Sequence, residues 1–78
     1  MKVWVIEDDE YIAVAVAATV DKAIAYVKAR YQDPYVVKWH APLERDPAYF
    51  VLLGDFQAVD GYSTAHTTQY DFRQFEVL

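Results

Sequence analysis

The sequence has 78 residues, of which 55% are hydrophobic, so we expect one small folded domain, residues 1–78, rather than a disordered chain. It contains no cysteine, which excludes disulfides and thiolate metal sites and favours a reducing compartment. The formal net charge is −5, and without a basic face direct binding to nucleic acid is disfavoured; we also expect no signal peptide and no transmembrane segment.

The first half of the chain predicts a β-hairpin followed by a helix. Residues 2–6 are apolar on both faces, as in a central strand covered on both sides. Residues 11–18 alternate larger side chains (Ile12, Val14, Val16) with alanines, which predicts a second strand with a core face and a closely covered face. Thr19 is placed to cap a helix over about residues 20–32, because apolar residues recur there at helical spacing. The Asp33-Pro34 pair ends this helix.

The second half predicts three more strands. Residues 35–40 form the third, and the prolines that bracket residues 41–47 predict a polar loop. Residues 49–56 form the fourth strand, and Asp60-Gly61, a pair typical of a type I′ hairpin, turns the chain into the fifth, which carries Tyr70 and Phe72 and then Phe75 and Val77.

The register of this last hairpin follows from its turn. If Val59 pairs with Tyr62, then Val51 lies opposite Tyr70, and Tyr49 lies opposite Phe72. The apolar residues change phase between Phe72 and Phe75, which predicts a bulge near Arg73-Gln74.

The predicted architecture is therefore α+β, with one helix packed on a mainly antiparallel five-stranded sheet in the order ββαβββ. One helix cannot cover both faces of such a sheet, so some aromatic residues should line a surface for a partner or for a symmetric homodimer. The aromatic residues concerned are Tyr35, Trp39, Tyr49, Phe50, Phe56, Tyr62, Tyr70, Phe72 and Phe75.

Four consecutive carboxylates and the tyrosine after them form the candidate partner-binding site. The carboxylates supply −4 of the net charge, which leaves eight acids against seven bases elsewhere. They can be a solvated turn that keeps the protein soluble, an acidic knob that docks into a basic pocket, or a local mimic of nucleic acid. A metal site is disfavoured, because EF-hand loops space their ligands and include a glycine that this run lacks. The candidate residues are Glu7, Asp8, Asp9, Glu10 and Tyr11.

No catalytic residues, metal ligands or cofactor are predicted. Ser63 and His66, with Asp55 or Asp60 nearby, would suit a nucleophilic triad only if the serine and the histidine met. Residues three apart on a strand point to opposite faces, so we expect that they do not meet. His40 and His66 have no partner at metal-ligand spacing, and neither glycine belongs to a phosphate-binding loop.

Several short stretches occur together in a recognisable order. The stretch "KVWVI" (2–6) opens the chain, "AAT" (17–19) closes the second strand on a helix cap, "KAIAYV" (22–27) begins the helix core, and "YDFRQFEVL" (70–78) ends the chain. Covering roughly half of the sequence, they resemble a class of small, mostly uncharacterised proteins of phages and prophages. The resemblance implies a protein in the cytoplasm of a bacterial host, and it assigns no activity to any residue.

The functional expectation is a non-enzymatic, acidic protein-binding module. Its most specific form is an anti-defence inhibitor similar to anti-CRISPR proteins, which would block the basic nucleic-acid-binding surface of a host defence complex. The alternatives are a homodimeric protein that binds a small molecule as a sponge or sensor, and a structural or regulatory phage accessory protein.

Overall fold

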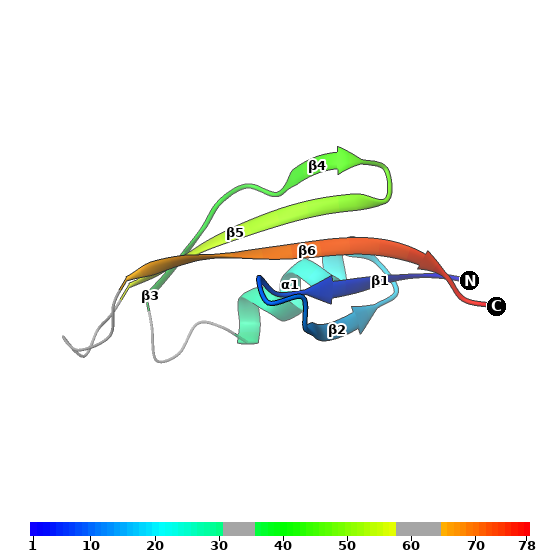
Figure 1. Cartoon of the computed structure of the whole chain (residues 1–78), viewed down its shortest axis with the longest axis horizontal. Helices are drawn as coiled ribbons and strands as arrows, with labels where there is room; N and C mark the ends of the chain where they lie inside the picture. Colours follow the sequence, from blue (N-terminus) through cyan, green and yellow to red (C-terminus); the bar gives the residue numbers. More distant parts are fainter. Residues whose placement is uncertain (31–35, 58–64) are drawn as a thin grey trace.

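A twisted, mainly antiparallel sheet with one helix packed against it makes up the computed structural model (Figure 1). The structure describes residues 1–30, 36–57 and 65–78, without the side chain of Val36. The predicted α+β class is confirmed, but the sheet has six strands rather than five. The elements are β1 (Lys2–Glu7), β2 (Ala13–Ala17), α1 (Val20–Arg30), β3 (Val36–Trp39), β4 (Leu43–Asp46), β5 (Tyr49–Gln57) and β6 (His66–Glu76).

The additional strand, β4, lies within residues 41–47, where the sequence predicted a loop. Leu43 lies opposite Val51 and Glu44 opposite Phe50, beside the same edge of β5 that pairs with β3 farther along. Together β3 and β4 form one interrupted edge strand, which needs hydrogen-bond partners on one side only. Prolines are tolerated at the ends of such a strand, so the two prolines did not indicate a loop.

The N-terminal hairpin and helix follow the prediction closely. The sheet order is β2-β1-β6-β5-β3, so β1 is a central strand, as expected. Thr19 caps α1, because its Oγ1 accepts a hydrogen bond of 3.2 Å from the backbone N–H of Lys22; such caps contribute about 1 kcal/mol. Residues 31–35, with the predicted end of the helix, lie outside the described residues.

The long hairpin of β5 and β6 forms with a register one residue away from the predicted one. Val51 lies opposite Asp71, not Tyr70, and Tyr49 lies opposite Arg73, not Phe72. The predicted Val59–Tyr62 pair and the Asp60-Gly61 turn lie outside the described residues.

The predicted bulge near Arg73-Gln74 is wrong. Strand β6 pairs with β1 without interruption from Glu76 to Asp71. The change of phase has a simpler cause: Phe72 is buried against the helix, whereas Phe75, three residues on, points to the other face and is 49% exposed. The pairing shifts elsewhere: in β2, where the register with β1 changes between Ile6 and Glu7, and in β4, where the register with β5 changes between Glu44 and Asp46.

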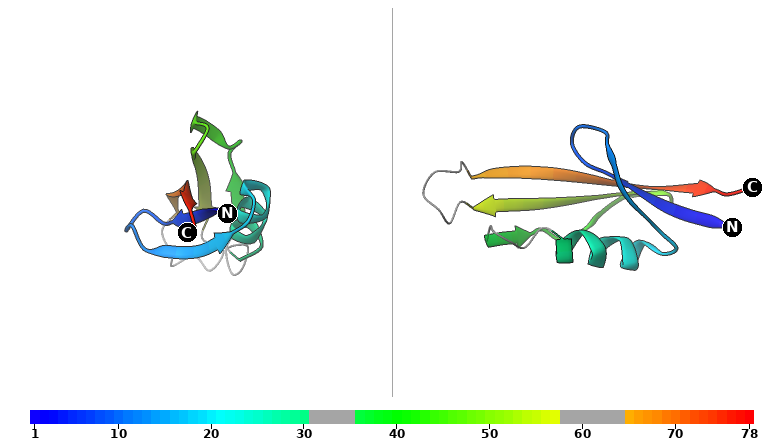
Figure 2. Two further views of the ribbon diagram at one scale, coloured as in Figure 1. Left: turned by 90° about the vertical axis from the view of Figure 1, so that its right-hand side faces the viewer. Right: turned by 90° about the horizontal axis from the view of Figure 1, so that it is seen from below.

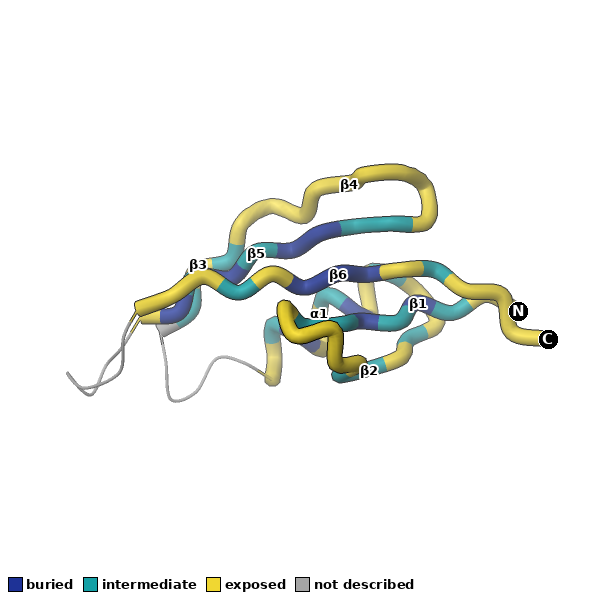
Figure 3. The backbone as a smooth tube through the Cα atoms, in the orientation of Figure 1, coloured by how far each residue is buried: buried dark blue, intermediate teal, exposed yellow. Residues whose placement is uncertain are grey.

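The core lies between the sheet and α1 (Figures 2 and 3). Alternate residues of β1, β5 and β6 meet two buried residues of the helix there. Two small residues of β2, Ala15 and Ala17, lie opposite Ile6 and Trp4, on the face that the helix covers. The buried cluster consists of Trp4, Ile6, Ala23, Val27, Leu52, Tyr70 and Phe72.

Candidate functional site

The acidic turn, residues 7–11, joins β1 to β2 and projects beyond the sheet (Figure 2). Asp8 holds it together. Its Oδ1 accepts hydrogen bonds from the backbone N–H groups of Glu10 (3.0 Å) and Ile12 (3.1 Å). Its own backbone N–H donates to the carbonyl of Ile12, and its carbonyl accepts from the N–H of Tyr11, both at 3.1 Å. Asp8 therefore belongs to the turn's framework, as an Asx-type residue does.

Of the other four residues of the acidic turn, one belongs to the sheet and three are exposed to solvent. Glu7 ends β1 and is partly buried, opposite Asp71 of β6. Asp9 and Glu10 are exposed, and Tyr11 is 78% exposed. The structure thus brings all five predicted residues together on one turn, with three of them directed outward.

Tyr11 adopts a conformation that is unusual for its residue type. Its φ is 61°, in the left-handed region that glycine and asparagine occupy readily and that bulky residues rarely adopt. Such a conformation costs on the order of 1–3 kcal/mol and is found disproportionately at functional sites. An exposed aromatic ring is held there without burial to compensate for it.

Two aliphatic residues that follow the acidic turn in the sequence are also exposed, and sequence reasoning missed both. Ile12 is 55% exposed and Val16 is 64% exposed, although their alternation with alanines predicted burial of the larger residues. The prediction was wrong because β2 lies at the edge of the sheet and its alanines, not Val16, face the helix. Periodicity distinguishes two faces of a strand but does not say which one is covered.

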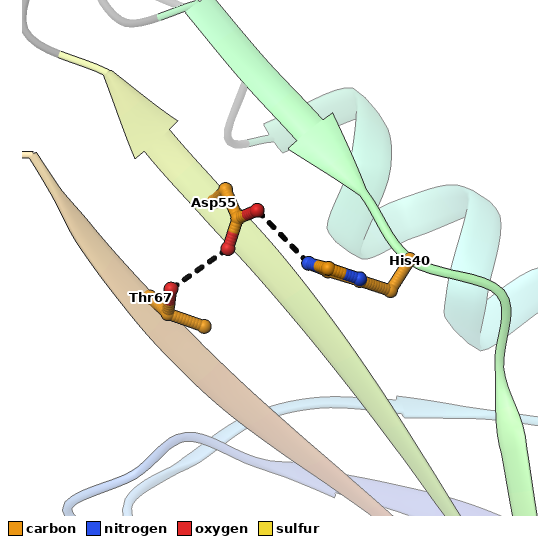
Figure 4. A network of polar contacts seen from close by, with 3 residues as sticks. All are labelled: His40, Asp55 and Thr67. Atoms are coloured by element: carbon orange, nitrogen blue, oxygen red, sulfur yellow. Dashed lines mark hydrogen bonds and ion pairs between the residues drawn. The ribbon is translucent and has the colours of Figure 1, made fainter.

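Asp55 lies at the centre of a polar cluster with His40 and Thr67, not in the triad that the sequence analysis disfavoured (Figure 4). Thr67 Oγ1 donates a 2.7 Å hydrogen bond to Oδ1 of Asp55, and Nε2 of His40 lies 2.9 Å from Oδ2 of the same carboxylate. His66 stacks on Phe56 instead, with ring centroids 5.1 Å apart. Ser63 and Asp60 lie outside the described residues. His40 therefore has a side-chain partner, Asp55, which the spacing of residues in the sequence did not indicate.

The order of groups in this cluster does not suit nucleophilic catalysis. A triad places the base between the nucleophile and the carboxylate, whereas here the carboxylate lies between the hydroxyl and the imidazole. Thr67 donates its hydrogen bond to Asp55, but a carboxylate whose pKa is lowered is a weak base for removing the hydroxyl proton. The hydrogen bonds from Thr67 and His40 hold the pKa of Asp55 below its ordinary value of 3.8, as expected for a structural carboxylate.

This lowered pKa predicts a pH-dependent contribution to stability. Because the pKa is lower in the folded state than in the unfolded state, the contribution is present above pH 3.8 and is lost as pH falls through the folded-state pKa. We expect Asp55→Asn to destabilise the protein at neutral pH and to be much closer to wild type in acid, as measured by urea unfolding across this range. Asp9→Asn, at an exposed carboxylate, is the control. A constant difference at all pH values would contradict the assignment.

Of the aromatic residues singled out in the sequence, Phe75 is exposed on the sheet face opposite the helix, and Tyr49 lies on the same face. Tyr49 donates a 3.0 Å hydrogen bond to Asp71, which also accepts one of 3.0 Å from Gln69 Nε2. The guanidinium of Arg73 lies 4.3 Å from the centre of the Tyr49 ring. Burial, with the bond to Asp71, raises the pKa of Tyr49. Tyr70 and Phe72 belong to the core on the helix side, as does Trp39, and Tyr35 and Tyr62 lie outside the described residues.

The described residues form neither a candidate metal cluster nor a helix that could span a membrane. Within residues 1–30, 36–57 and 65–78, no three His, Cys, Asp or Glu side chains are grouped as a metal site would require. In the same part of the chain, α1 is too short and too polar to cross a membrane.

Comparisons of the chain with protein-family models, with curated proteins and with solved structures found no match.

Proposed function

We propose that this chain is a small, non-enzymatic protein-binding module that docks its acidic turn onto a basic surface of a larger protein. The observation that carries the proposal is the construction of the turn. Asp8 fixes the backbone with its own side chain, which leaves Asp9, Glu10 and Tyr11 directed into solvent. Solubility alone does not require an exposed tyrosine in a left-handed conformation, which costs free energy.

The two kinds of side chain on the turn would act differently in a complex. Carboxylates facing Lys or Arg accelerate encounter and discriminate between partners more than they add affinity. A tyrosine supplies affinity, because it brings a large contact area and a hydroxyl at a small cost in conformational entropy. The acidic turn combines both within five residues, next to the exposed Ile12.

In its specific form, the proposal is a phage-type inhibitor that acts in the cytoplasm of a bacterial host and covers the nucleic-acid-binding surface of a defence complex. One observation and one expectation from the sequence support this form. Four of the acidic groups behind a net charge of −5 lie consecutively in one turn, so a basic groove would meet dense negative charge there. The N-terminal half also resembles small phage and prophage proteins.

Capture of the partner from a bacterial lysate tests the proposal. Tagged wild type is compared with Asp9→Asn/Glu10→Gln, which keeps Asp8 and therefore the turn. The control, Asp21→Asn/Glu44→Gln, makes the same change in charge at two exposed sites elsewhere. We expect the turn variant to retain less partner than the control, because charge complementarity is lost only there. Equal retention by the two variants would contradict the proposal.

Tyr11→Asn provides a second arm of the same experiment. Asparagine tolerates the left-handed conformation, so this variant should be at least as stable as wild type. It removes the aromatic ring, however, and should therefore retain less partner. Unchanged retention would mean that Tyr11 does not contact the partner.

A further inference from the structure

The two edges of the sheet are built differently. The β3–β4 edge is interrupted, has a proline on each side of β4, and exposes several charged side chains, all of which hinder pairing with another strand. Its charged residues are Lys38, Glu44, Arg45 and Asp46. The β3–β4 edge is therefore protected against pairing with another strand, as edge strands of soluble proteins usually are.

The opposite edge, β2, lacks this protection. Ala13–Ala17 contains neither a charge nor a proline, and β2 pairs with β1 on one side only. The Val16 side chain is 64% exposed, and a groove of about 470 Å³ runs between β2 and α1. The residues that line the groove are Ala15, Val16, Ala17, Ala18, Lys22 and Tyr26. An uncharged edge strand beside an open groove is a template for strand addition.

One end of this edge is already occupied. Arg30 Nη1 donates a 3.5 Å hydrogen bond to the carbonyl of Val14, at the bulge, and another of 3.2 Å to Tyr26 Oη. The regular, open part of the edge therefore runs from Ala15 onward, and its midpoint lies near Val16.

We propose that β2 pairs with the β2 strand of a second copy of this chain, antiparallel about a two-fold axis at Val16. This register sets Ala15 opposite Ala17 of the other copy and brings the two exposed Val16 side chains together. No charged residue meets a like charge within the paired strands, so the edge is complementary to itself. A two-fold axis generates a closed dimer whose sheet continues through both copies.

Charge complementarity favours a second copy over an unrelated strand. The antiparallel arrangement places the start of one β2 strand, where the acidic turn ends, beside the end of the other, where α1 begins. The positive end of the helix dipole and Lys22, which lines the groove, then lie near the acidic turn of the other copy. By symmetry this favourable pairing occurs twice.

Light scattering on the purified protein tests the dimer. Val16→Lys places two like charges at the axis, whereas Leu43→Lys makes the same change at a 51% exposed position on the protected edge. At high micromolar concentration, wild type and Leu43→Lys should have twice the chain mass of 9.0 kDa, and Val16→Lys should have 9.0 kDa. A wild type that stays at 9.0 kDa, or two variants that dimerise equally, would overturn the proposal.

Cysteine cross-linking tests the axis in case Val16→Lys does not fold. The chain has no cysteine, so Val16→Cys introduces a single thiol. Cα atoms that face each other in an antiparallel pair lie about 4.5–5.5 Å apart, within the range that a disulfide spans. Mild oxidation should link Val16→Cys into covalent dimers much faster than the control Leu43→Cys. Equal rates would overturn the register.

The dimer and the proposed function can fail separately. Val16 is not part of the acidic turn, and Asp9→Asn/Glu10→Gln keeps every residue of the paired strands although it removes charge that would face α1 of the other copy, so light scattering of this variant shows whether it still dimerises. If monomeric Val16→Lys still retains the partner from a lysate, the acidic turn acts without dimerisation.

Discussion

Phe72→Ala should destabilise the protein by about 3–5 kcal/mol, which is a large part of the total stability expected for a domain of this size. Phe72 is fully buried on β6, between Ile6 of β1 and Phe50 of β5. It therefore joins the N-terminal hairpin to the long hairpin, and removing its ring leaves a cavity at the point where the two meet. Urea unfolding followed by circular dichroism measures the loss.

Phe75→Ala is the matched control for this prediction. It removes the same ring from the same strand, but Phe75 is 49% exposed on the other face. Its cost should be much smaller, because little apolar surface is lost from the core. Similar costs for the two substitutions would mean that the core does not lie on the helix side of β6.

Gly54→Val should destabilise the protein by about 1–3 kcal/mol, although valine is favoured in strands over glycine. The Trp39 ring packs directly on Gly54: a Cβ placed there would lie 2.6 Å from Cζ3 and 2.9 Å from Cε3 of the ring. The ring has little freedom to move away, because it also packs against Tyr70 and Phe56, with centroid distances of 5.9 and 6.2 Å. Strand propensity alone predicts that Gly54→Val stabilises the protein. A measured loss of stability therefore identifies the contact with Trp39 as the cause.

A double-mutant cycle isolates this contact. In a Trp39→Leu background the ring that opposes the new Cβ is gone, so Gly54→Val should cost less than it does in wild type. Urea unfolding of the two single variants and the double variant gives the coupling energy. An equal cost in both backgrounds would show that Gly54 is required for another reason.

Local elements of this fold were predictable where a residue type strongly prefers one position in secondary structure. Thr19 at the helix start and the apolar spacing after it predicted both the cap and α1. Strand pairing was less predictable, because register depends on the whole turn between two strands. A shift of one residue in the β5–β6 pair changed the partner of Tyr70 from Val51 to Leu52.

The sequence predicted which residues form the candidate site but not how their side chains are arranged. Four adjacent carboxylates were evident in the sequence, yet only the hydrogen bonds show that Asp8 supports the turn while Asp9 and Glu10 face solvent. The partnership of His40 with Asp55 was hidden because His40, just after β3, and Asp55, on β5, are 15 residues apart in the sequence. The exposure of Val16 followed from sheet order, which periodicity does not determine.

The central claim, that the acidic turn binds a basic surface, is tested most directly by the salt dependence of association. The captured partner is immobilised, and the association rate constants of wild type and Asp9→Asn/Glu10→Gln are measured from low to high ionic strength. Exposed charges are screened as the Debye length falls to about 3 Å at 1 M salt. The wild-type rate should therefore fall steeply toward that of the variant, whose own rate should change little. Equal rates for the two proteins, with the same salt dependence, would contradict the claim.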